Sequence, residues 1–268
     1  MKVVILAGGM GTRISEESQL RPKPMIEIGG KPVLWHIMKL YSYYGYNEFI
    51  ICCGYKGQMI KEYFIHYYVN QSDSTFLLQN KEVVVHEVFA EPWRVTLSNT
   101  GLHTLTAGRV LKIRDYIGED EEFFLTYGDG VSDVDIAALL RFHHENGRVA
   151  TITTTKPLGR FGALKIDGQN RVLGFREKAR TDSAWVNAGF MVLNKRVFDY
   201  LGDGNEMLEA GPFEKIAGDG EMAAYKYDGF WSPMDTLRDK NYLEELWETG
   251  RAPWKVWQGK MLESGGTI

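Results

Sequence analysis

Residues 3–13 read Val-Val-Ile-Leu-Ala-Gly-Gly-Met-Gly-Thr-Arg, an apolar run that opens directly into a glycine-rich loop. The apolar run predicts a buried strand, Val3–Ala7. Glycine lacks the Cβ that would hold a ligand away from the backbone, and successive N–H groups of such a loop can point at an anion. The stretch therefore predicts a phosphate site where the first strand ends.

The glycine spacing differs from two common phosphate motifs. It does not match the dinucleotide motif G-x-G-x-x-G, and the chain contains no G-x-x-x-x-G-K-[ST]. Further along, Lys23 lies between Pro22 and Pro24, whose rings fix the φ angles on either side. Arg13 and Lys23 are therefore candidates for holding a triphosphate, the alternatives being a surface arginine and a loop lysine.

The composition is that of a globular chain with a substantial core. Of its 268 residues, 44% are hydrophobic and 13% aromatic, and the net charge of −4 comes without a basic patch for nucleic acid. Cys52 and Cys53 lie in an apolar strand-like run, which favours buried thiols in a reducing compartment over a metal or redox pair. Glycines interrupt the first apolar run, and no apolar stretch approaches the ~20 residues of a membrane span, so we expect a cytoplasmic protein without a membrane partner.

Strand-like and helix-like segments alternate in the first half. We expect strands at Val3–Ala7, Phe49–Cys53 and Phe123–Thr126, and helices at Val33–Tyr44, Gly57–Val69, Thr106–Ile117 and Ile136–Asn146. Such alternation predicts right-handed βαβ units and a mostly parallel sheet, whose ligands gather at the carboxyl ends of its strands. The glycine-rich loop and Gly128-Asp129-Gly130 both fall on that edge.

The second half is richer in strands. We expect strands at Ala150–Thr155, Ala163–Ile166, Val172–Glu177 and Trp185–Leu193, two extended pieces within Glu82–Asn99, and a last helix at Leu237–Glu248. These elements together predict the α/β class.

Two aspartates are candidate metal ligands. Asp129 follows an apolar strand and is flanked by glycines, and Asp235 follows an aromatic extended piece at the start of the last helix. Mg²⁺ favours one or two carboxylates together with substrate phosphate oxygens and waters, which such a pair fits. The alternatives are a turn residue for Asp129 and a helix N-cap for Asp235.

Other polar residues give weaker signals. Arg109 could reach a phosphate from a helix start or be an exposed helix residue, and Glu177-Lys178 at a strand end could address sugar hydroxyls and a sugar phosphate. Only the adjacent pair His143-His144 departs from an otherwise scattered set of histidines, and it points two ways on a helix. No Ser/His/Asp or Cys/His arrangement is suggested.

Taken together, these motifs resemble the signature of the sugar-1-phosphate nucleotidylyltransferases. The resemblance rests on residues 6–13, 22–25, 27–32, 128–129 and 177–178. Longer segments, at 35–39, 50–57, 91–97, 127–131, 159–164 and 230–240, are most similar to the branch of that family that uses CTP and glucose 1-phosphate. The similarity runs from Lys2 to about Trp257.

The resemblance implies transfer of CMP from CTP to α-D-glucose 1-phosphate with Mg²⁺, giving CDP-glucose and pyrophosphate for the dideoxyhexoses of a lipopolysaccharide O-antigen. It implies a Rossmann-like fold, a mostly parallel mixed sheet flanked by helices with a strand-rich sugar-binding part and a C-terminal helix. We expect one domain over 1–257, with a nucleotide-binding half at about 1–147, a sugar-binding half at about 148–234 and a helical segment at about 235–257, then a disordered tail at 258–268. The resemblance also implies a homo-oligomer and suggests a hexamer.

By position, the resemblance gives each motif residue a role. Backbone groups of the first loop would meet the cytosine and ribose: Leu6, Ala7, Gly8 and Gly9. The triphosphate would be held by Gly11, Thr12 and Arg13, with Lys23 at the α-phosphate. The remaining nucleotide contacts would be Met10, Thr104 or Thr106, Arg109 and Gly128. The metal would be held by Asp129 and Asp235, and the sugar phosphate by Glu177, Lys178, Asn187 and Gly189. Arg13, Lys23 and Asp129 are the residues predicted to be catalytic.

The chain departs from the family pattern at two positions, Ala179 in place of a proline and Asn99 in place of an aspartate. Neither is a predicted metal ligand. Two other functions stay open on the motifs alone: the same reaction with a uridine or thymidine nucleotide, and a non-catalytic nucleotide-binding regulator on the same fold.

Overall fold

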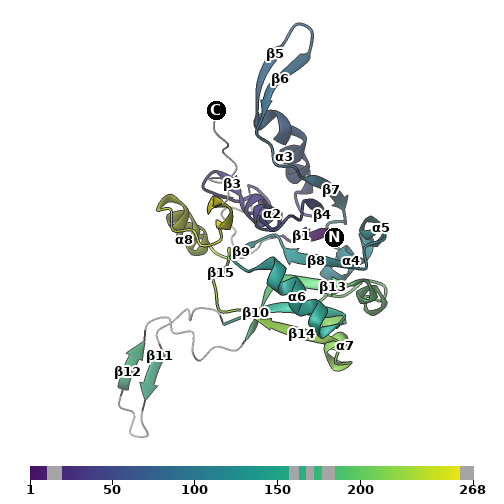
Figure 1. The fold of residues 1–268 in the computed structure, drawn as a ribbon, viewed down its shortest axis with the longest axis vertical. Helices are drawn as coiled ribbons and strands as arrows, with labels where there is room; N and C mark the ends of the chain where they lie inside the picture. Colours follow the sequence, from purple (N-terminus) through teal and green to yellow (C-terminus); the bar gives the residue numbers. More distant parts are fainter. Residues whose placement is uncertain (11–19, 157–162, 167–171, 177–184, 260–268) are drawn as a thin grey trace.

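A seven-stranded sheet forms the centre of the molecule (Figure 1). The computed structural model describes residues 1–10, 20–156, 163–166, 172–176 and 185–259. The strand order is β14 (Met222–Lys226), β10 (Ala150–Thr155), β13 (Val186–Asn194), β8 (Glu122–Tyr127), β1 (Val3–Ala7), β4 (Glu48–Cys53) and β7 (Arg94–Asn99). Within this sheet β13 runs antiparallel to β10 and β8, and the other neighbours are parallel. The predicted mostly parallel mixed sheet is confirmed.

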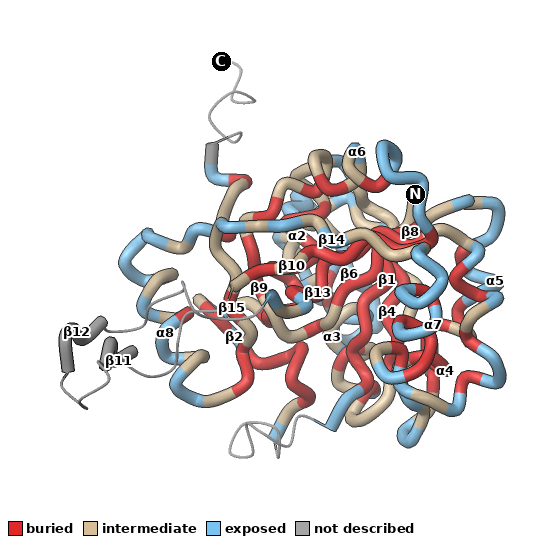
Figure 2. The backbone as a smooth tube through the Cα atoms, turned by 90° about the horizontal axis from the view of Figure 1, so that it is seen from below, coloured by how far each residue is buried: buried red, intermediate tan, exposed pale blue. Residues whose placement is uncertain are grey.

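Helices cover both faces of this sheet. One face carries α2 (Val33–Tyr43), α3 (Gly57–Asn70), α6 (Ile136–Asn146) and α8 (Leu237–Glu248), and the other carries α4 (Thr106–Lys112), α5 (Arg114–Ile117), η3 (Lys195–Tyr200) and α7 (Pro212–Gly218). Side chains of β1 alternate between the two layers, Val3 and Ile5 in the first and Val4 and Leu6 in the second. Figure 2 shows buried residues concentrated in the central strands, with exposed residues around the periphery.

Short two-stranded sheets surround the central one. They pair β2 (Glu27–Ile28) with β3 (Lys31–Pro32), β5 (Ser72–Leu77) with β6 (Glu82–Val88), β9 (Gly130–Ser132) with β15 (Trp231–Pro233), and β11 (Ala163–Ile166) with β12 (Val172–Arg176). Two short helices, η2 (Lys23–Met25) and η4 (Val256–Gly259), complete the described elements. The β5–β6 hairpin, here called the arm, projects from the body beyond α3 (Figure 1).

Most predicted elements are confirmed within one or two residues, and the last helix matches at both ends. The single helix predicted at Thr106–Ile117 is wrong, because Ile113 leaves helical geometry at ψ 6° and separates α4 from α5. Strands β5 and β14 and helix α7 were not predicted. The described helices include none that is long and apolar enough to cross a membrane.

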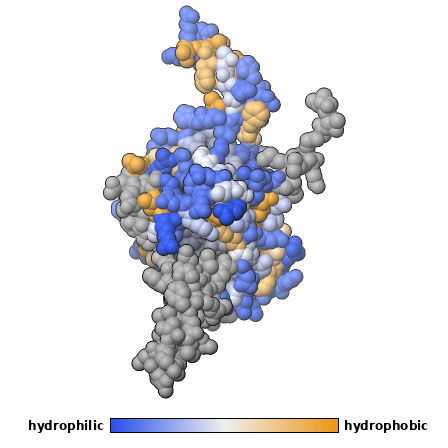
Figure 3. Space-filling view, turned by 90° about the vertical axis from the view of Figure 1, so that its left-hand side faces the viewer, coloured by the Kyte–Doolittle hydropathy of each residue, from blue (hydrophilic) through white to orange (hydrophobic). Residues whose placement is uncertain are grey.

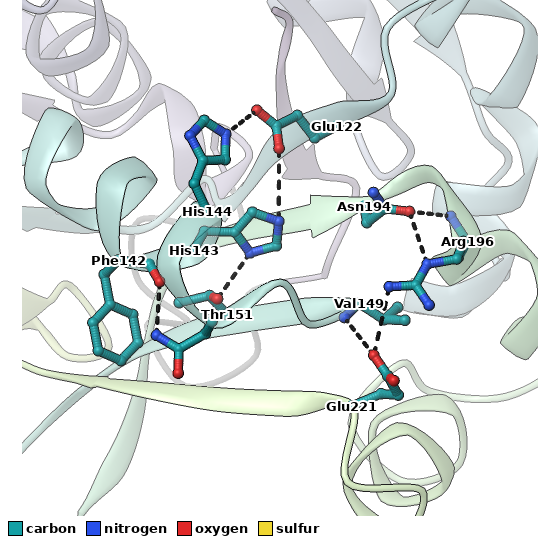
Figure 4. Close-up of polar contacts among 10 residues, drawn as sticks. Glu122, Phe142, His143, His144, Val149, Thr151, Asn194, Arg196 and Glu221 are labelled. Carbon is teal, nitrogen blue, oxygen red and sulfur yellow. Dashed lines mark hydrogen bonds and ion pairs between the residues drawn. The ribbon is translucent and has the colours of Figure 1, made fainter.

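The amino-terminal edge of the sheet carries the adjacent histidines. His144 Nε2 lies 2.6 Å from one oxygen of Glu122, and His143 Nε2 lies 3.7 Å from the other (Figure 4). His143 also bonds the Thr151 hydroxyl at 2.8 Å, and its burial lowers its pKa. Glu122 begins β8 whereas Asp129 follows its end, so this cluster ties α6 to the sheet far from the predicted site. Cys52 and Cys53 are buried free thiols, as predicted.

Candidate functional site

A pocket of about 330 Å³ opens at the carboxyl ends of β1 and β8. These strands are parallel neighbours, so the loops that follow them leave the same edge of the sheet. The lining consists of Leu6, Ala7, Gly8, Gly9, Lys23, Pro24, Thr104, Leu105, Thr106, Arg109, Tyr127, Gly128, Asp129 and Met207. Among the described residues predicted to bind the nucleotide, Met10 alone lies off this lining, at 46% exposure.

The Lys23 ammonium group lies between two carboxylates at the pocket. Lys23 is only 7% exposed. Its Nζ donates to Asp129 Oδ2 at 2.7 Å and to Asp235 Oδ1 at 2.6 Å. A buried ammonium group is stable only when hydrogen-bonded charges of opposite sign replace its hydration. The structure thus joins three residues predicted separately into one charged cluster.

The pairing of β9 with β15 explains how the two aspartates meet. Gly130 pairs with Pro233 in this antiparallel ladder, and the Met234 N–H donates to the Asp129 carbonyl at 2.8 Å. Asp129 precedes β9 and Asp235 follows β15, so both carboxylates leave the same end of the two-stranded sheet. Three paired positions thus bring together Asp129 and Asp235, which are 106 residues apart in sequence.

Asp235 is not the N-cap of the last helix. Thr236 is the N-cap: its side chain accepts from the Asp239 N–H, and the Asp239 carboxylate accepts from the Thr236 N–H at 2.8 Å. This capping box supplies the acceptors that the helix start needs. The Asp235 carboxylate is therefore directed at Lys23 instead.

The donor set fits a divalent cation that completes its coordination with substrate. The described part of the chain holds no cluster of three or more His, Cys, Asp or Glu side chains able to bind a metal alone. Asp129 and Asp235 already hold a cation, the Lys23 ammonium group, between their oxygens. Two carboxylates, one of them lining a pocket that phosphate oxygens and water can enter, match the preference of Mg²⁺.

Arg109 ties together the loops that follow β1 and β7. Its guanidinium group donates to the Gly8 carbonyl at 3.0 Å, to the Thr100 hydroxyl at 2.6 Å and to the Gly101 carbonyl at 2.9 Å. Burial lowers its pKa. It is 5% exposed, so the alternative of an exposed helix arginine is wrong, and Arg109 both lines the pocket and holds the neighbouring loops in place.

Two glycines make room for that guanidinium group. A Cβ on Gly8 would lie 2.1 Å from Arg109 Nη1, and one on Gly54 would lie 2.5 Å from the same atom. A larger residue at either position would displace Arg109. The first glycine of the loop is thus required by protein packing as well as by approach of a ligand.

Tyr127 and Thr106 both bond Glu209, and Asn187 bonds Tyr127. The Tyr127 hydroxyl donates to Glu209 Oε1, and the Thr106 hydroxyl donates to Oε2 at 2.9 Å. Asn187 Nδ2 donates to the Tyr127 hydroxyl at 3.3 Å. Burial raises the pKa of Tyr127, and the Glu209 carboxylate adds to the effect. Asn187 reaches this edge because β13 runs antiparallel to β8.

Gly189 lies against the same tyrosine. Its φ is +86°, a region that favours glycine, and a Cβ there would lie 2.7 Å from Tyr127 Cδ2. Thr104, the alternative to Thr106, donates its hydroxyl proton to the Thr100 carbonyl at 2.6 Å.

Some predicted residues fall outside the described ranges. They are Gly11, Thr12, Arg13, Glu177 and Lys178. The residues of the site that were not predicted include Tyr127 and Glu209. Tyr127 stands beside Gly128-Asp129 and could have been included on that ground, whereas Glu209 lies in a loop with no motif around it.

A family model described as nucleotidyl transferase matches residues 2–236. The chain belongs to this nucleotidyl transferase family. It is 53% identical to glucose-1-phosphate cytidylyltransferase of Salmonella typhi, over 96% of this chain and 100% of the relative. It is 46% identical to probable glucose-1-phosphate cytidylyltransferase of Bacillus subtilis, again over 96% and 100%. In fold, this nucleotidyl transferase resembles the crystal structure of HddC from Yersinia pseudotuberculosis with GMP-PN, at TM-score 0.66 and 22% identity over 92% of this chain and 99% of that one.

Proposed function

We propose that this nucleotidyl transferase moves CMP from CTP to α-D-glucose 1-phosphate, releasing pyrophosphate and forming CDP-glucose. The observation that carries the proposal is the cluster of Lys23, Asp129 and Asp235, which lies at the pocket lined by the glycine-rich loop after β1. The relatives at 53% and 46% identity, both named as cytidylyltransferases of glucose 1-phosphate, supply the choice of base and sugar. A uridylyltransferase of Synechocystis is only 28% identical, so a uridine nucleotide is the weaker candidate.

We propose Asp129 and Asp235 as the residues that hold Mg²⁺. The ion would neutralise phosphate charge and polarise the reacting phosphoryl group. Lys23 contacts both carboxylates and also lines the pocket, so its ammonium group can contact the α-phosphate of a bound nucleotide. With Mg²⁺ on the two carboxylates, the Lys23 ammonium group would be free to offset the charge that develops on the α-phosphate.

Nucleotide contacts are assigned along the pocket wall. Backbone groups of Leu6, Ala7, Gly8 and Gly9 would meet the cytosine and ribose, with Gly128 opposite them on the β8 loop. We retain Gly11, Thr12 and Arg13 as the proposed triphosphate loop, on the sequence resemblance. Arg109 is proposed to act by holding the Gly8 carbonyl, which orients the peptide groups that face the nucleotide.

The sugar phosphate is assigned to the Tyr127 side of the pocket. Asn187 and Gly189 both touch Tyr127, which supports their predicted place there. Glu177 and Lys178 are assigned to the same subsite on the sequence resemblance.

The reaction requires no protein nucleophile. An ionised phosphate oxygen of glucose 1-phosphate forms the new bond to the α-phosphorus as the bond to the β-phosphate oxygen breaks, and pyrophosphate carries away that electron pair. The enzyme aligns two anions and offsets their repulsion, which is a task for fixed positive charges.

Nucleotide choice tests this proposal. Pyrophosphate release is measured with glucose 1-phosphate and each of CTP, UTP and dTTP, and we expect turnover with CTP to exceed the others. Asp129→Ala or Lys23→Ala should lower turnover about 100-fold or more, the scale of losing one preorganised charge contact. Near-normal turnover in either variant contradicts the assigned role, and nucleotide binding without any turnover would favour a regulator.

We also propose a homo-oligomer whose contacts include the arm. Apolar side chains stand exposed on it, among them Phe76 at 53%, Leu78 at 85% and Val83 at 46%. Figure 3 shows hydrophobic residues over this projection. A patch of this kind on a projecting hairpin is typical of a protein contact.

We further propose a cytoplasmic location, which agrees with two free, buried thiols.

A further inference from the structure

Glu209 holds two walls of the pocket without lining it. The residue lies in the loop before α7, whereas Tyr127 ends β8 and Thr106 begins α4. Each of its carboxylate oxygens accepts one hydroxyl proton, Oε1 from Tyr127 and Oε2 from Thr106. The carboxylate therefore fixes how far apart these two pocket residues lie.

The same bonds decide which way the two hydroxyl groups are polarised. An ionised carboxylate only accepts hydrogen bonds, and a hydroxyl has a single proton to give. Once that proton points at Glu209, Tyr127 and Thr106 can offer a ligand only their lone pairs. The neighbours agree with this polarity, since both hydroxyl oxygens already accept, from Asn187 Nδ2 at 3.3 Å and from the Leu208 N–H at 2.7 Å.

A ligand group that meets these hydroxyls must then bring its own proton. Phosphate oxygens of CTP or of a sugar phosphate are acceptors at neutral pH, so they gain nothing from either hydroxyl. A sugar hydroxyl is a donor and fits. Tyr127 is the closer of the two to the predicted sugar-phosphate residues, since it touches Asn187 and Gly189.

We propose that Glu209 is a positioning residue for the sugar: it holds the Tyr127 hydroxyl as an acceptor for a hydroxyl group of the sugar phosphate. The inference rests on the proposed function, because glucose 1-phosphate is the ligand it names. Glu209 does not line the pocket, so we expect its effect to fall on binding of the sugar and not on the chemical step.

Glu209→Gln is the sharpest test. Glutamine keeps the size of the side chain but places an NH₂ donor where one carboxylate oxygen stood, so one hydroxyl must turn its proton away. We expect KM for glucose 1-phosphate to rise about tenfold, the loss of one hydrogen bond in a buried polar site, while kcat and KM for CTP change less than about threefold. Glu206→Gln is the matched control, because Glu206 lies in the same loop and pairs with Lys215 at 3.5 Å.

A second variant keeps the test independent of folding. Tyr127→Phe removes the hydroxyl itself and should raise the same KM, and adding Glu209→Gln should then raise it little further, because the two residues act as one unit. Fully additive effects, or a KM for glucose 1-phosphate unchanged in Glu209→Gln, would overturn the inference.

The proposed function and the role of Glu209 are tested by separate measurements. Wild-type turnover with CTP and glucose 1-phosphate tests that function, and calorimetric binding of glucose 1-phosphate to the wild type and to Glu209→Gln tests Glu209 without turnover. Weaker binding to the variant supports the inference, and equal binding overturns it.

Discussion

Replacing Lys23 by methionine should make the stability of the protein depend on a divalent metal. The ammonium group is the cation that the structure shows between Asp129 and Asp235, at 2.7 and 2.6 Å. Methionine fills similar space but leaves two carboxylates facing each other without it. In the wild type the lysine competes with a metal for the same oxygens, and in the variant it does not.

The size of the effect follows from burial. Removing one partner of a buried ion pair costs about 3–5 kcal/mol. The Asp235 side chain is 11% exposed but that of Asp129 is 33% exposed. Water reaches Asp129, so we take the lower end, about 3 kcal/mol, or a fall in Tm of about 5–6 °C for a chain of this size. Magnesium at about 100 times its Kd for the variant should raise the free energy of unfolding of the variant by about 2.7 kcal/mol.

The assay is thermal unfolding with and without millimolar MgCl₂, in the absence of nucleotide. We expect Lys23→Met to unfold at lower temperature without metal and to recover most of the loss with it, whereas the wild type gains less. Lys2→Met is the control, because it breaks the Lys2–Asp120 pair at 2.8 Å away from the pocket. Equal metal stabilisation of the wild type and Lys23→Met would refute the reasoning.

Three further outcomes follow from packing. Burial lowers the pKa of His36 from 6.5 to about 4. Because the pKa is lower in the folded state, the free energy of unfolding is highest above about pH 6.5 and falls by about 2 kcal/mol at pH 5. Urea titration should find this loss absent in His36→Gln. Gly8→Ala, whose Cβ would lie 2.1 Å from Arg109 Nη1, should lower stability by about 1–3 kcal/mol in a thermal scan, whereas Gly9→Ala meets no atom within 4 Å and should not. Phe76→Lys combined with Val83→Lys should reduce the solution mass measured by light scattering, and an unchanged mass would remove the arm from the proposed interface.

The regular part of the fold could be predicted because local pattern and tertiary role agree there. Val3–Ala7 is an apolar run buried on both faces, and Ile136–Asn146 ends at Gly147 in the left-handed conformation that a helix C-terminus favours. The arm was partly missed because its first strand, Ser72–Leu77, is exposed and lacks the apolar alternation that marks a half-buried strand.

The site could be predicted residue by residue but not as an arrangement. Lys23, Asp129 and Asp235 each stood out for local reasons, yet their meeting depends on the register of β9 against β15, which no local pattern encodes. Glu209 could not be found for the same reason: its role exists only because a loop far along the chain returns to β8 and α4.

The β9–β15 ladder also has a consequence for how the protein is made. The Asp129 half of the cation cluster is present when half the chain has been synthesised, but its partner strand is Trp231–Pro233. During synthesis, therefore, the ribosome releases the pocket lining from β1 and β8 long before it releases Asp235. A fragment that ends before β15 lacks Asp235, so Lys23 has a single carboxylate there, and the charged cluster is complete only once Asp235 has been synthesised.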